Sequence, residues 1–215
     1  CELRAFRGGT PSLNSVMIMG LDWWKDQDLR EIHEPTLARS LGVKHLREPP
    51  LMDEEEGGAW NMVPAARFPR TLVCSKCERI GIVGKQFDGT RMGTPRCNAN
   101  GCSGHGVPAR IVTACFHSAK DGEADLQPGH IDEFPWEAWA FSEHDGQKCK
   151  SPQLFLGALG NTSSLAGLRV ECRCPECEER TPKYIGRTLA DVFQPDNLGG
   201  LRFFGRRPWL NDQQS

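Results

Sequence analysis

The chain of 215 residues is poor in the features that mark motors, membrane proteins and secreted proteins. It has no run of about 18 consecutive apolar residues, the length that a membrane-spanning helix needs, and no recognisable secretory signal at its start. It also lacks a P-loop, because Gly84-Lys85 has no glycine at the required upstream position and is followed by Gln86. We therefore expect a cytoplasmic protein that is not itself a P-loop ATPase.

Common catalytic signatures are absent as well. Neither H-E-x-x-H, nor the deaminase pairing of H-x-E with P-C-x-x-C, nor G-x-S-x-G occurs in the chain. His130 with Asp132 is a candidate acid/base or metal pair, which His144 could complete in a metal-dependent nuclease. The alternative interpretation, a capping residue beside aromatic anchors, is the one we favour, and we expect no enzymatic activity.

Few residues are available for a large apolar core. Hydrophobic residues make up 38% of the chain, and 23 glycines and 15 prolines indicate many loops. Ten cysteines suggest that bound metal supplies part of the stability. We expect an α+β fold: a small mixed domain with many loops, built around one zinc ribbon and a second cysteine-rich zinc knuckle. The expected parts are an acidic N-terminal segment (1–66), the zinc ribbon (67–114) and a second zinc-knuckle domain (115–215).

The first cysteine group consists of two close pairs. Cys74 and Cys77 are separated by two residues, Cys97 and Cys102 by four, and nineteen residues lie between the pairs. Two tight turns that face each other can offer four thiolates to a tetrahedral zinc ion, as in a zinc ribbon. Disulfides and free structural cysteines are the alternatives, and His105 could substitute as a ligand. In the reducing cytoplasm we favour zinc.

The segment 67–110 that holds this group is basic. It has eight Lys and Arg against two Asp and Glu, a net charge of +6, whereas the whole chain carries −2. Lys and Arg displace counterions from a phosphate backbone, so the charge favours nucleic-acid binding, with docking onto an acidic protein surface as the alternative. The candidate nucleic-acid-binding residues, including two from a basic-aromatic tail, are Arg67, Arg70, Lys76, Arg79, Lys85, Arg206 and Arg207.

The second cysteine group comprises Cys149, Cys172, Cys174 and Cys177. Cys174-Pro175-Glu176-Cys177 has the spacing of a zinc knuckle, and four cysteines could close a second site. Either Cys172 or Cys174 could instead be spare, with His144 in the fourth place. We therefore expect one zinc ion per chain and regard two as an alternative.

The expected secondary structure consists mostly of short elements. Apolar runs and turn residues predict a buried strand at 15–19, a helix at 34–42 and a helix that begins within 130–139. They also predict strands at 71–73, 80–83, 153–157 and 169–172, and a helix at 186–193.

Six sequence stretches, in this order, resemble the DrmB family, the helicase-associated component of the bacterial DISARM anti-phage system. They are VMIMGLDWW (16–24), LGVKHLREPP (41–50), AARFPRTLVCSKC (65–77), GHIDEFPWEAW (129–139), SSLAGLRVECRC (163–174) and GRRPWL (205–210). The combination is specific, and it covers nearly the whole chain. Family members tend to have a cysteine before the GRRPW run, where this chain has Phe203-Phe204, so another residue such as Cys174 or His144 would complete the second metal site.

The resemblance implies an antiviral defence protein whose partner is DrmA, a helicase-like ATPase, with DNA of single-stranded character as the shared ligand. The family is larger, so we expect this chain, which begins at Cys1 and ends in a polar DQQS, to be a piece of a longer polypeptide. Our first hypothesis is a non-enzymatic zinc adaptor that binds DNA together with this partner. The second is a scaffold that contacts only protein, and the third is the nuclease.

Overall fold

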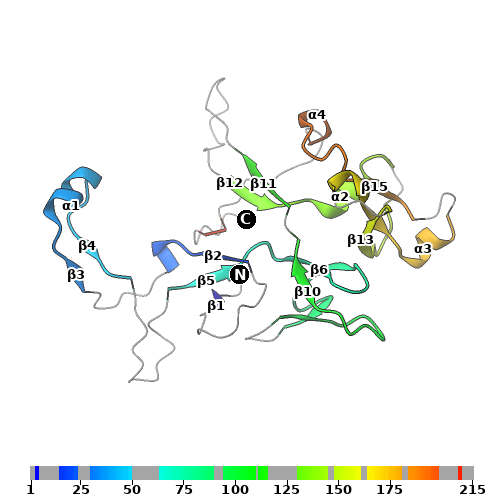
Figure 1. Ribbon diagram of the computed structural model, residues 1–215, viewed down its shortest axis with the longest axis horizontal. Coiled ribbons are helices and arrows are strands. Elements are labelled where there is room, and N and C mark those ends of the chain that lie inside the picture. The colour runs from blue at the N-terminus through cyan, green and yellow to red at the C-terminus, as the bar shows by residue number, and fades with distance from the viewer. Residues whose placement is uncertain are drawn as a thin grey trace. The chain divides into compact units, whose positions relative to one another are not determined.

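A computed structural model describes residues 3–4, 15–23, 30–49, 63–89, 94–109, 111–115, 130–144, 148–160, 164–180, 184–198 and 208–209. The chain divides into two compact units. The first comprises Cys1–Thr10, Val16–Arg67 and Pro208–Ser215, and the second comprises Pro11–Ser15 and Phe68–Arg207. Among the described residues, no helix is long and apolar enough to cross a membrane. The fold is a mixture of short helices and small sheets (Figure 1).

The first unit contains two small antiparallel sheets. One has the strand order β1-β5-β2 and the other pairs β3 with β4. The elements are β1 (Leu3–Arg4), β2 (Val16–Ile18), η1 (Leu21–Trp23), β3 (Glu31–Ile32), α1 (Pro35–Leu41), β4 (Leu46–Arg47) and β5 (Ala65–Arg67). The helix predicted at 34–42 is confirmed: Pro35 occupies its first turn, and Gly42 ends it with φ of 67°.

The strand predicted at 15–19 is present, but the prediction that it is buried is wrong. Val16 and Ile18 are exposed, and Ile18 retains 64% of its accessible surface. Only Met19, just after the strand, is buried, and its backbone N–H donates to the carbonyl oxygen of Pro64. An apolar run alone does not reveal whether anything covers both faces of a strand.

The second unit begins with a sheet of order β10-β6-β7 and a two-stranded pair, β8 with β9. The strands are β6 (Thr71–Cys74), β7 (Ile80–Ile82), β8 (Phe87–Asp88), β9 (Arg96–Cys97) and β10 (Gly106–Pro108). The strands predicted at 71–73 and 80–83 are therefore confirmed. A Cβ at Gly106 would lie 2.7 Å from Cδ1 of Leu72 and 3.1 Å from Cδ1 of Phe87, so the glycine leaves room for these two buried side chains.

The rest of the second unit contains a two-stranded pair, β11 with β12, and a sheet of order β13-β14-β15. Its elements are β11 (Val112–Cys115), β12 (His130–Glu133), α2 (Trp136–Phe141), β13 (Leu154–Ala158), η2 (Leu165–Gly167), β14 (Leu168–Cys172), α3 (Pro175–Glu178), β15 (Gly186–Thr188) and α4 (Pro195–Leu198). The strands predicted at 153–157 and 169–172 are confirmed. The helix expected from 130–139 begins only at Trp136, because His130–Glu133 pairs with β11.

The helix predicted at 186–193 is wrong. Gly186–Thr188 forms strand β15, which pairs antiparallel with β14, and turns follow it. A Cβ at position 186 would lie 2.3 Å from the carbonyl oxygen of Val170, so the glycine permits close approach of the two strands. Leu189 and Val192 are buried in the core beyond the strand. Their three-residue spacing resembles that of a helix, but both side chains reach the core from the bend and turn that follow β15.

Two clusters of buried side chains hold the second unit together. The larger is centred on Trp139, which is fully buried, and on Phe134, whose ring stacks edge-on against Trp136 at 4.8 Å. It also contains all four cysteines of the second group. The smaller cluster has only four buried members: Leu72, Cys74, Phe87 and Cys97. Each group of cysteines therefore belongs to a different apolar cluster.

Candidate metal centres

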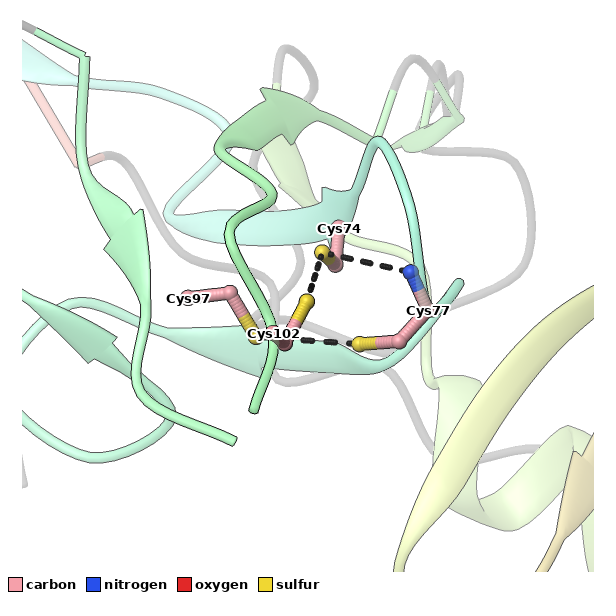
Figure 2. Close-up of side chains that lie close together, drawn as sticks. All are labelled: Cys74, Cys77, Cys97 and Cys102. Atoms are coloured by element: carbon pink, nitrogen blue, oxygen red, sulfur yellow. Dashed lines mark hydrogen bonds between the residues drawn. The ribbon is translucent and has the colours of Figure 1, made fainter. Parts of the chain in front are cut away.

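The first cysteine group is assembled from two loops, each closed by backbone hydrogen bonds. The N–H of Cys74 donates to the carbonyl of Arg79, and the N–H of Cys97 donates to the carbonyl of Gly104, both at 2.9 Å. Figure 2 shows the four side chains of Cys74, Cys77, Cys97 and Cys102 pointing toward one another. We call them the first tetrad.

The sulfur positions in the first tetrad suit a tetrahedral ion. Sγ of Cys74 lies 3.6 Å from Sγ of Cys102, and Sγ of Cys77 lies 3.7 Å from Sγ of Cys97 (Figure 2). All four atoms lie within 4.8 Å of one another. Four thiolates about 2.3 Å from a zinc ion would be separated by about 3.8 Å. The observed separations are far longer than the roughly 2.05 Å of a disulfide bond, and all four cysteines are free.

Backbone N–H groups two residues further along the chain point at the sulfurs of the first tetrad. The N–H groups of Lys76 and Gly104 lie 3.4 Å from Sγ of Cys74 and Cys102, respectively. Those of Arg79 and Ala99 serve Cys77 and Cys97 in the same way. Donors of this kind favour the thiolate, the form that binds metal.

Without metal, the thiols of the first tetrad differ in acidity. Burial raises the pKa of Cys77 from 9.0 to about 12, and it also raises the pKa of Cys97. The N–H of Gly104 lowers the pKa of Cys102 to about 7. A divalent cation must therefore displace protons from some of these thiols, and Cys102 is the one best prepared to bind first.

The second cysteine group also closes into a set of four. Cys149, Cys172, Cys174 and Cys177 are all buried, and their sulfurs lie within 4.8 Å of one another, with Cys149 and Cys177 at 3.2 Å. Cys172 ends β14, and Cys174 precedes the single turn of α3, which Pro175 starts. That turn brings Cys174 and Cys177 to the same side. We call these residues the second tetrad.

The structure brings all four cysteines of the second tetrad together without His144. Among the described residues, the groups suited to a metal ion consist of cysteines alone. Burial raises the pKa of Cys172 to about 11 and raises that of Cys149 further. At Cys174 burial also opposes ionisation, but hydrogen bonds from Cys149 and from the N–H of Cys177 outweigh it and lower the pKa.

The remaining candidate ligands have other contacts. Nδ1 of His105 lies 3.1 Å from Oγ of Ser75, and both residues are exposed. Oδ1 of Asp132 accepts a hydrogen bond from the N–H of Glu133 at 2.8 Å, within strand β12. The expectation that one of these acids caps the following helix is wrong, because α2 has Pro135 at its N-cap and no side-chain capping hydrogen bond. The side chain of His130 lies outside the described residues.

The candidate DNA-contacting residues are distributed over both units. Arg67 belongs to the first unit and is half-buried. In the second unit Arg70, Lys76 and Lys85 are exposed and Arg79 is half-buried. Lys76 lies between two ligands of the first tetrad, and its Nζ donates to Oγ of Ser103 at 2.6 Å. Arg206 and Arg207 lie outside the described residues.

Sequence reasoning missed the structural role of Glu133. Its carboxylate accepts hydrogen bonds from the backbone N–H groups of Arg70 and Thr71, at 2.7 and 3.0 Å, and from the hydroxyl of Thr71. It thus fixes the entry into β6, the strand that carries Cys74. The available sequence signal was that Arg70 and Thr71 lie in one stretch resembling the DrmB family (65–77) and Glu133 lies in another (129–139). This side chain joins the two stretches.

Comparisons with known proteins agree with these motifs. The family model described as "Domain of unknown function (DUF8724)" matches residues 4–215. A protein named "DISARM protein DrmB", from Bacillus paralicheniformis, is 32% identical over 206 residues, which are 94% of this chain and 31% of that protein. The chain therefore spans about a third of the length of this relative. The resemblance stated from the motifs is confirmed.

Proposed function

The chain belongs to the DUF8724 family, and 94% of the chain is similar to part of a DISARM protein. From that premise we propose a function in antiviral defence. It is a non-enzymatic, zinc-stabilised adaptor of an anti-phage defence complex. It binds DNA together with a partner helicase or translocase of the DrmA type. Such a complex works in the cytoplasm, where thiols stay reduced.

The observation that carries the zinc assignment is the arrangement of eight free thiols in two tetrads. Cysteine sulfurs in sets of four are the ligands of structural zinc sites. With zinc bound, the loops around the first tetrad and strands β6 to β9 would form a zinc ribbon, and the second tetrad would form a zinc knuckle. Neither site keeps a ligand position for water, which supports a structural rather than a catalytic role.

Support for DNA binding comes from the basic side chains around the first tetrad. Arg70, Lys76 and Lys85 are exposed, and Glu78, the acidic residue nearest to Arg70 and Lys76 in sequence, is occupied by an ion pair with Arg173. A metal-stabilised loop that displays cations suits the backbone of a single strand, because such contacts are independent of sequence. Arg67, Arg79, Arg206 and Arg207 belong to the same proposal.

The test compares two lysines that each neighbour a zinc ligand. Lys76→Gln removes a cation at the first tetrad, and Lys150→Gln removes an exposed cation next to Cys149 of the second tetrad. Affinity for single-stranded DNA is measured over a range of salt concentrations. If about six phosphates are neutralised, the logarithm of the affinity should fall with that of salt with a slope of roughly −4. We expect Lys76→Gln to weaken binding and reduce the slope by about 0.7, and Lys150→Gln to change neither.

A flat salt dependence, or equal effects of the two substitutions, would contradict DNA binding by the ribbon. Retention of the partner ATPase without any DNA binding would instead support a scaffold that contacts only protein. The nuclease hypothesis has weaker support, because Asp132 is engaged by the backbone and is not part of either metal-ligand group. DNA cleavage that is lost in His130→Ala would revive it.

A further inference from the structure

The two tetrads are joined by a contact between residues that neighbour their ligands. Glu78 directly follows Cys77 of the first tetrad, and Arg173 lies between Cys172 and Cys174 of the second. Nη2 of Arg173 is 3.6 Å from Oε2 of Glu78. The ligand loops of the two tetrads therefore touch through an ion pair.

The backbone of β13 provides a second connection between the same loops. The N–H of Leu156 donates to the carbonyl oxygen of Glu78 at 2.9 Å, and Arg79 forms a β-bridge with Phe155. Just before the strand, the N–H of Gln153 lies 3.4 Å from Sγ of Cys172, and its carbonyl accepts from the N–H of Arg173 at 2.8 Å. One short stretch of chain thus holds both ligand loops.

Arg173 is held in position from several sides. Its Nε donates to Oε1 of Glu171 at 2.6 Å, and its guanidinium lies 4.9 Å from the ring centroid of Phe155. Gly157 leaves room for it, because a Cβ there would be 3.2 Å from Nη2 of Arg173. The arginine is therefore ordered before it meets Glu78, and little side-chain entropy remains to be lost in the ion pair.

Glu78 has an unusual backbone conformation. Its φ is 62°, a left-handed value that glycine adopts without cost and that other residues adopt less readily. The turn after Cys77 would suit glycine, yet the chain has a glutamate whose carbonyl and carboxylate both reach the second tetrad's side of the unit. Its side chain therefore has a use that offsets the backbone cost.

We propose that the two metal sites are thermodynamically coupled, with Glu78, Arg173 and strand β13 as the connection. Metal bound in one tetrad orders the ligand loop of that tetrad. Through the connection this also orders the ligand loop of the other tetrad, and it thereby raises the affinity of the other tetrad for metal. Because such coupling is reciprocal, loss of either ion weakens the hold on the other. This inference rests on the zinc binding stated under Proposed function.

The experiment follows zinc loss from the full chain by native mass spectrometry during titration with a chelator. Strong coupling makes the two-zinc and zinc-free species dominate over the one-zinc species. At a fixed concentration of free zinc, Glu78→Gln and Arg173→Gln should each raise the ratio of one-zinc to two-zinc protein by roughly two- to fivefold, the range for a single exposed ion pair. The double variant should add nothing further, because the same pair is already broken. Glu176→Gln, an exposed acid between two ligands of the second tetrad, is the matched control and should behave like wild type.

A second measurement distinguishes coupling from simple damage to one site. In a Cys102→Ser background, which disables the first tetrad, Glu78→Gln should no longer alter zinc release from the second. Equal ratios in wild type and in both ion-pair variants, or additive effects in the double variant, would overturn the coupling and leave the proposed zinc adaptor intact. Wild-type protein purified without any zinc would overturn both.

Discussion

The two tetrads offer a metal ion the same four sulfurs in different surroundings. All four cysteines of the second tetrad are buried, and they belong to the cluster around Trp139. The first belongs to a cluster of four buried residues, and Cys77 and Cys102 are only half-buried. Metal in the second site would therefore stabilise the main core, and metal in the first would stabilise a basic loop with a small core of its own. Ligand identity alone does not reveal this difference; the surrounding core does.

The largest expected effect is from Cys177→Ser, compared with Cys102→Ser. Zinc contributes about 10–16 kcal/mol to the folding of zinc-finger peptides, and a whole domain is stable by only about 5–15 kcal/mol. Losing the second zinc should therefore unfold the core around Trp139, whereas losing the first should leave that core folded. Near-UV circular dichroism of the tryptophans and zinc content per chain measure both outcomes. A folded Cys177→Ser protein, or an unfolded Cys102→Ser protein, would reverse the assignment of the two sites.

An intermediate effect is expected from Gly104→Ala. A Cβ at this position would lie 2.4 Å from Sγ of Cys74, so a methyl group intrudes on the first tetrad. Overpacking of this kind costs about 1–3 kcal/mol, which corresponds to a loss in zinc affinity of roughly 5- to 150-fold at the first site. Competition with a chelating dye measures the affinity.

The control for Gly104→Ala is Gly101→Asn. Gly101 has φ of 71°, and no atom lies within 4 Å of the position that a Cβ would take there. Asparagine tolerates this left-handed conformation, so the variant should retain zinc at the first tetrad. Unchanged affinity in Gly104→Ala would show that the loop relaxes and that the close approach is dispensable.

The smallest effect is a difference in acid sensitivity between the two sites. Without metal the pKa of Cys77 is raised to about 12 and that of Cys172 to about 11, so zinc binding releases protons at neutral pH. Zinc affinity should accordingly rise with pH, and both ions should leave as the pH falls. We expect the half-exposed first tetrad to release its ion at a higher pH than the buried second tetrad. An acid titration of native protein, with zinc detected by a dye, measures this order, and simultaneous release would point to dominant coupling.

Local spacing was enough to predict which residues form the first tetrad, because each pair is closed by one turn. Spacing named Cys149 as a candidate for the second group, but it did not settle which four residues close the second tetrad. Cys149 is distant in sequence from Cys172, and only the pairing of β13 with β14 brings their surroundings together. The spacing of Cys172, Cys174 and Cys177 left either of the first two as a spare, with His144 as a substitute.

Other features depended on tertiary contacts that no local pattern encodes. The apolar residues from Gly186 to Phe193 have the spacing of a helix. The first three residues of this run nevertheless form a strand, because they pair with β14. The exposure of Ile18 and the left-handed turn at Glu78 were equally unpredictable, since a glutamate gives no signal for positive φ. The acids of the HIDEF stretch suggest a helix cap by their position, whereas Glu133 binds the start of β6.

The backbone N–H groups directed at the sulfurs of the first tetrad have a consequence for chemical reactivity. Once zinc has deprotonated all four thiols, a sulfur that also accepts such hydrogen bonds is a weaker nucleophile, because nucleophilicity falls as the thiolate becomes more stable. With zinc bound as well, Cys74, Cys77, Cys97 and Cys102 would resist alkylation and oxidation although two of them reach the surface. The exposed loop is thereby suited to remain intact during oxidative stress, when unprotected surface thiols are the first to be modified.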